Sequence, residues 1–107
     1  MRYYKYLYLS EGLERKKDRV IRRLETGKLQ PSIYLVLISD HSRNQMEIVR
    51  AVCLLQPNYP RDQLLVAGIA ESHGEALELV EKMVRETYDS TGEADVRNYI
   101  LMKEQEG

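Results

Sequence analysis

Apolar residues along the chain form two kinds of pattern, which together predict alternating strands and helices. The continuous runs Ile33–Ile38 and Leu64–Ala70 are typical of strands buried on both faces of a sheet. Tyr3–Leu9 alternates in polarity and Val96–Met102 is mixed, so both are predicted as strands at the edges. The predicted strands begin at residues 3, 33, 64 and 96, a spacing that fits one strand and one helix per unit.

Two of the intervals between these strands have the spacing of amphipathic helices. In the first interval, an apolar face precedes Gly27, a residue type that favours a helix end. That face consists of Leu13, Val20, Ile21 and Leu24. In the third interval the expected helix ends at Gly92, and its apolar face consists of Ala76, Leu77, Val80, Met83, Val84 and Tyr88.

The remaining interval, Met46–Leu55, is open to two interpretations. Its apolar residues fit one face of a helix that leaves Glu47 and Arg50 outside, but the same run also fits a strand. We favour a helix because the run is ten residues long and because parallel strands need a crossover connection. Pro57 and Pro60 would then end that helix.

This alternation predicts a single small α/β domain over residues 1–107, in the order βαβαβαβ. We expect a four-stranded, mostly parallel sheet with helices packed on it and the two continuous apolar runs at its centre. A chain of 107 residues has room for one such core.

The aromatic composition changes the interpretation of the first strand. The chain has 8 Tyr, no Phe and no Trp, so every buried ring brings a hydroxyl that needs water or a partner. In an alternating strand Tyr4, Tyr6 and Tyr8 face the same way. They are expected either to lie under a helix with their hydroxyls at its rim, or to form an interface with a second chain.

Charge is divided between the two halves of the chain. Residues 1–50 hold 11 basic and 6 acidic side chains, whereas residues 51–107 hold 5 and 11, and the net charge is -1. The basic residues centre on the segment 13–28. They fit a solvated helix face, a contact with another copy of the protein, or nucleic-acid binding. The pI of about 6.1 and the lack of aromatic residues in that segment argue against nucleic acid.

Familiar catalytic motifs are missing from the sequence. It has no phosphate-binding G-x-x-x-x-G-K-[ST], no dinucleotide-binding G-x-G-x-x-G, no H-E-x-x-H, no C-x-x-C and no G-x-S-x-G. The single cysteine, Cys53, excludes an internal disulfide and is expected to be a small buried apolar residue. We therefore predict no catalysis by a familiar motif and no cofactor.

Polar residues nevertheless gather directly after three of the predicted strands. If the strands are parallel, their carboxyl ends share one edge of the sheet, where α/β proteins bind ligands and helix N-termini supply amide donors. The candidate ligand-binding residues at this edge are Ser10, Asp40, His41, Ser42, Arg43, Glu71, Ser72 and His73.

Two kinds of ligand fit this set, and a structural interpretation competes with both. An anion would contact Arg43, Ser42 and Ser72. A metal ion would be held by the side chains of His41, His73, Asp40 and Glu71. The competing interpretation is that Ser42 and Ser72 cap helices, since Gln or Glu follows each three residues later. We favour the capping interpretation and assign no metal.

The sequence therefore predicts a cytoplasmic α/β module that acts through protein contact, as a homodimer, without catalysis of its own. One alternative is a ligand- or anion-binding domain, hydrolytic or metal-assisted, that uses His41 and His73. A second alternative is nucleic-acid contact through the basic segment 13–28. A membrane partner is not expected, because the longest apolar runs fall far short of ~20 residues and no apolar leader follows Met1.

Overall fold

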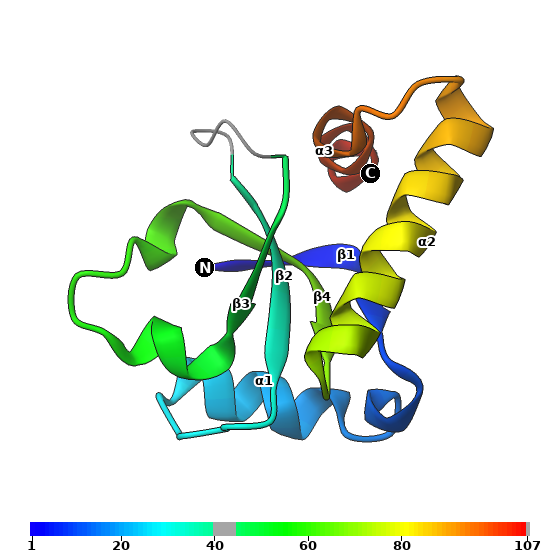
Figure 1. The fold of residues 1–107 in the computed structure, drawn as a ribbon. Helices are drawn as coiled ribbons and strands as arrows, with labels where there is room; N and C mark the ends of the chain where they lie inside the picture. Colours follow the sequence, from blue (N-terminus) through cyan, green and yellow to red (C-terminus); the bar gives the residue numbers. More distant parts are fainter. Residues whose placement is uncertain (40–44, 107) are drawn as a thin grey trace.

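Four strands form one mixed sheet in the order β1–β4–β2–β3 (Figure 1). The strands are β1 (Arg2–Leu9), β2 (Tyr34–Ser39), β3 (Glu47–Arg50) and β4 (Leu64–Ala70). β1 runs parallel to β4, whereas β2 runs antiparallel to both β4 and β3. The two continuous apolar runs occupy the centre as predicted, and every residue of β4 is buried.

The computed structural model describes residues 1–39 and 45–106, and within them the mostly parallel sheet that we predicted is wrong. Only seven residues separate Ser39 from Glu47, which is too few for the crossover that a parallel neighbour requires. β3 therefore pairs with β2 in the antiparallel sense, with Leu37 opposite Glu47.

The interval Met46–Leu55 is a strand and a turn, so the helix that we favoured there is wrong. β3 ends at Arg50, and a 3-10 turn, η2 (Ala51–Leu55), follows it. The β-branched neighbours Ile48 and Val49 suit a strand, where their side chains point to opposite faces of the sheet. Ile48 packs on the α2 side and Val49 on the α1 side.

The predicted strand Val96–Met102 is also wrong, because this segment forms the helix α3 (Val96–Gln105). The Asp95 side chain caps the helix by accepting a 3.1 Å hydrogen bond from the backbone N–H of Asn98. Val96 and Ile100, four residues apart, are its buried residues and lie on the same side of the helix. The βαβαβαβ order is therefore not found.

The other two helices lie close to where the sequence places them. α1 (Lys17–Glu25) follows a 3-10 turn and is followed by Gly27, whose φ is 71°. α2 (His73–Thr91) ends at Gly92, which caps it with a φ of 75°. The predicted helix ends at both glycines are therefore confirmed.

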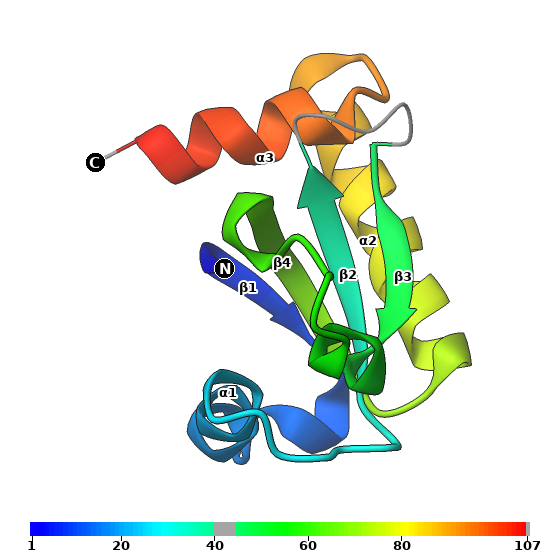
Figure 2. The ribbon, with the colours of Figure 1, turned by 90° about the vertical axis from the view of Figure 1, so that its left-hand side faces the viewer.

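Helices cover both faces of the sheet and divide the apolar residues into two cores (Figures 1 and 2). α2 and α3 lie on one face, over Val36 and Ile38 of β2. α1 and η2 lie on the other, over Leu35 and Leu37. No helix in the described ranges is long and apolar enough to cross a membrane.

The buried side of α2 differs from the predicted one. The residues that face the sheet are Ala76, Leu79, Met83 and Thr87. The buried Thr87 hydroxyl keeps a hydrogen bond, because it donates to the Met83 carbonyl oxygen at 2.7 Å. Leu77, Val84 and Tyr88, which we predicted on the buried face, are exposed instead.

Candidate functional site

The strands that precede the predicted ligand-binding residues do not all end at the same edge of the sheet. β1 and β4 are parallel, so Ser10 and Glu71 follow strands that end at the same edge. Ser39, the last residue of β2, pairs with Leu64, the first residue of β4, at the opposite edge. The predicted site residues Asp40, His41, Ser42 and Arg43 lie outside the described residues.

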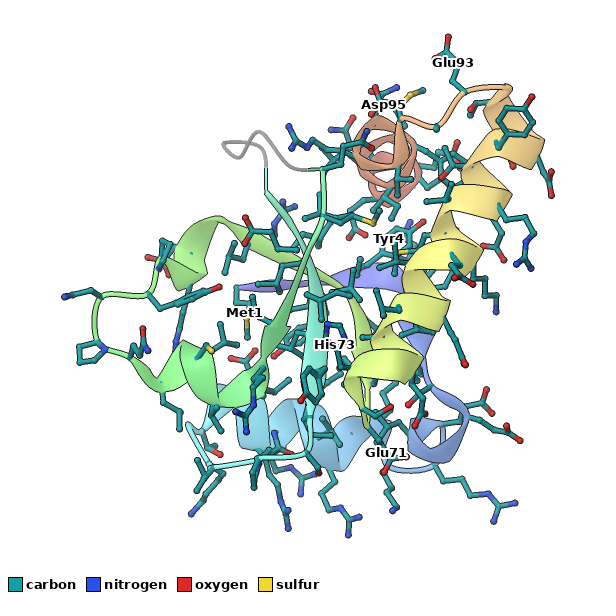
Figure 3. All side chains as sticks on the ribbon, viewed as in Figure 1. Met1, Tyr4, Glu71, His73, Glu93 and Asp95 are labelled. Carbon is teal, nitrogen blue, oxygen red and sulfur yellow. The ribbon has the colours of Figure 1, made fainter. Side chains whose placement is uncertain are left out.

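The site residues that follow β4 act as a helix cap and as packing contacts (Figure 3). Ser72 is the N-cap of α2, and its Oγ accepts a 3.1 Å hydrogen bond from the backbone N–H of Glu75. The His73 ring meets the Tyr34 ring edge-on, with 5.9 Å between centroids. The cap at Ser72 confirms that half of the capping interpretation, and Ser42 lies outside the described residues.

Glu71 and Ser10 are the other predicted site residues at this edge of the sheet. The Glu71 carboxylate lies over Gly12, where an added Cβ would come within 2.1 Å of Oε1. Ser10 is 5% exposed, and its Oγ has no hydrogen-bond partner among the described residues. Within the same residues, no three His, Cys, Asp or Glu side chains gather as metal ligands.

Tyr4, Tyr6 and Tyr8 of β1 form a cluster on the face of the sheet that α2 and α3 cover. The Tyr4 ring is 3% exposed and stacks on the Tyr8 ring, with 6.3 Å between centroids. Tyr6 meets Tyr4 edge-on at 5.7 Å and is 52% exposed. The Tyr8 hydroxyl donates a hydrogen bond to the Glu86 carboxylate of α2. The first strand therefore has the predicted alternation, with two of the three rings covered.

Burial changes the acidity of these hydroxyls. The pKa of Tyr4 is raised to about 12, chiefly by removal of the hydroxyl from water and also by the neighbouring Tyr99 and Glu104. Burial also raises the pKa of Tyr8, as does its hydrogen bond to Glu86. Both phenols therefore remain neutral at physiological pH, in keeping with a structural role.

The end of α3 covers the outer edge of β1 near Lys5. The backbone N–H of Lys5 donates to Glu104 Oε2 at 2.8 Å, and its ammonium group donates to the Glu106 carbonyl oxygen. The Lys103 ammonium lies 5.4 Å from the centre of the Tyr6 ring. β1 therefore lacks a free donor at Lys5 for pairing with another strand. We did not foresee this contact because residues 96–102 were predicted as a strand.

A groove of about 540 Å³ lies on the same face of the sheet but at the β3 edge, between β3, α2 and the start of α3. Its lining is mostly apolar and consists of Gln45, Met46, Ile48, Val80, Val84, Ala94 and Val96. Val84 also belongs to an exposed row on α2 with Leu77 and Tyr88, which we call the α2 stripe. This surface was not predicted from the sequence, because the residues of the stripe were assigned to the buried face of the helix and those of β3 to another helix.

Opposite charges lie on opposite faces of the sheet. The lysines and arginines between residues 15 and 28 are all exposed, and Figure 3 shows nitrogen-tipped side chains along the outer side of α1. On the other face, residues 73–106 hold 9 acidic and 4 basic side chains. The division seen along the sequence thus becomes a division across the fold.

Comparison with known proteins gives no relative. No protein-family model matches the chain, no curated protein matches it, and no solved structure matches it.

Proposed function

We propose that the protein works by binding a second copy of itself, as a homodimeric contact module without catalysis of its own. The observation that supports this is the exposure of the α2 stripe: Leu77 is 46% exposed, Val84 36% and Tyr88 61%. Isolated apolar residues are common on protein surfaces, but a row beside an apolar groove is typical of a contact site. The polar residues that follow β4 give less support to the ligand-binding alternative, since Ser72 caps a helix and Glu71 covers Gly12.

The experiment that tests this proposal is a measurement of mass against concentration. Light scattering and sedimentation velocity from micromolar to millimolar protein should show a change from the 12.5 kDa monomer to a species of twice that mass. Far-UV circular dichroism across the range confirms that the fold is unchanged. A monomer at every concentration would overturn the proposal.

The exposed cations of α1 support a second candidate, which is contact with nucleic acid. Its test is fluorescence anisotropy of a generic DNA duplex at several salt concentrations. Binding that weakens steeply with salt and is weakened by Arg19→Glu would support it, because contact between these cations and the phosphates releases counterions from the duplex. The absence of binding at low salt would exclude it.

A further inference from the structure

We infer that the second copy docks along the α2 stripe, so that the two α2 helices pack antiparallel about a two-fold axis. This inference rests on the proposed homodimer and adds the surface, the orientation and the register. It moves the contact away from β1, where the sequence placed it, to the side of the molecule that holds the apolar groove.

The geometry of α2 favours a partner helix. Val84 lies seven residues beyond Leu77 and Tyr88 lies eleven beyond it, close to two and three full turns, so their side chains align along the helix. They point about 100° away from the row that packs on the sheet. With 19 residues, α2 is about 28 Å long. An exposed apolar row of this length and spacing matches the seam of a helix pair.

The charges beside the stripe indicate that the partner is a second copy. Glu78 and Arg85 are both exposed and lie on the same flank of the stripe, seven residues apart. In an antiparallel helix pair, equivalent flanks of the two helices face each other. If Leu77 meets the partner's Tyr88, Glu78 comes beside the partner's Arg85, and the two-fold axis repeats this pair. In a parallel helix pair, Glu78 and Arg85 would instead face the flank of the partner's α2 that borders the groove.

The groove borders the other flank of the stripe. Val80 and Ile48 line it and are only partly buried. Because equivalent flanks meet in the antiparallel pair, the two grooves lie against each other. The contact therefore covers apolar side chains of β3 as well as those of α2, which a helix-only contact would leave exposed.

The same register places Glu81 beside the two-fold axis, facing the partner's Glu81. Like charges at this position oppose association, and each copy's own Arg85, four residues along, offsets them in part. Glu81→Gln should therefore tighten the dimer by about twofold, because it removes a contact between like charges.

Charge exchange tests the register. Glu78→Arg and Arg85→Glu each replace two attractive pairs with two repulsive ones, so each should raise the dimer Kd by about tenfold. The double variant, Glu78→Arg with Arg85→Glu, restores opposite charges and should return the Kd to within about threefold of the wild type. A double variant as weak as the single ones would overturn the antiparallel register.

Substitution of the stripe tests the surface. Val84→Asp should raise the dimer Kd at least a hundredfold, whereas Leu29→Asp, at a residue that is 66% exposed on another part of the molecule, should leave it unchanged. Circular dichroism checks that both variants fold. A dimer that resists Val84→Asp and is weakened by Tyr6→Ala would overturn the α2 surface while leaving self-association intact. A wild-type monomer at all concentrations would overturn both.

Discussion

The backbone N–H of Lys5 donates a 2.8 Å hydrogen bond to the carboxylate of Glu104, which is 99 residues later in the sequence. The first strand is thereby fixed to the last helix at a point where an edge strand would otherwise present a free donor.

Glu104→Ala should lower the free energy of unfolding by about 1 kcal/mol, because the Lys5 N–H loses a charged acceptor. Urea denaturation at pH 7 measures this change. Glu106→Ala is the matched control, since Lys5 contacts only the backbone carbonyl of Glu106 and that contact survives. Equal losses in the two variants would contradict the specific role of Glu104.

The two serines that follow β1 and β4 should respond to alanine in opposite ways. Ser72→Ala removes the N-cap of α2 and should cost about 1 kcal/mol of stability. Ser10→Ala removes a buried hydroxyl that has no described partner, so it should be neutral or stabilising. Thermal denaturation of both variants gives the comparison. A large loss on Ser10→Ala would reveal a hydrogen bond that the structure does not show.

The two glycines at the ends of α2 provide a second matched pair. Gly92 has a φ of 75°, so Gly92→Ala should cost about 1 kcal/mol through backbone strain. Gly74 lies in the first turn of the helix, and an added Cβ would meet nothing within 4 Å. Gly74→Ala should therefore stabilise the protein by about 0.5 kcal/mol. Unfolding curves in urea measure both changes, and destabilisation by Gly74→Ala would contradict the open space at its Cβ.

Stability should fall as the solution becomes strongly alkaline. Burial raises the pKa of Tyr4 to about 12, whereas an unfolded tyrosine has a pKa near ~10. The unfolded chain therefore releases a proton that the folded chain keeps. The contribution to stability is complete below pH ~10 and is lost as the pH rises toward 12. The pKa of Tyr8 is raised in the same direction.

Urea denaturation between pH 8 and about 11 tests this dependence. Tyr4→Phe removes one of the titrating groups and should reduce the alkaline loss of stability, while the contribution of Tyr8 remains. Tyr88→Phe is the control, because its ring is 61% exposed and is not among the groups that raise the pKa of Tyr4. An unchanged slope in Tyr4→Phe would show that burial of Tyr4 is not the cause.

Parts of the fold followed from signals that act locally. Continuous apolar runs identified both central strands, and alternation in the first strand predicted which tyrosines share a face. Ser72 and Gly92 marked the ends of α2 because caps depend on the residue type at one position. Whether β2 runs parallel or antiparallel to its neighbours depends instead on the length of the connection that follows it. We assumed a helix there, and that single assumption gave β2 the same direction as β4, whereas the two strands are antiparallel.

The two misassigned segments show where pattern alone is insufficient. β3 is four residues long, so its alternation is too short to separate from a helical face. The helix α3 did carry a signal, since Asp95 precedes Asn98 by three residues and Val96 and Ile100 are four apart. The α2 stripe could not be assigned from the sequence, because a second apolar row beside the buried one looks like part of a wide buried face.

The position of β1 in the sheet also determines when the fold can form. Among the described residues β1 is the first strand, yet its one neighbouring strand in the sheet is β4, whose Ile69 is paired with Leu9 across 60 residues of sequence. A growing or refolding chain therefore holds β1 without a neighbour until β4 is available. Such long-range closure slows folding, and it leaves a tyrosine-rich strand exposed to aggregation until β4 pairs with it.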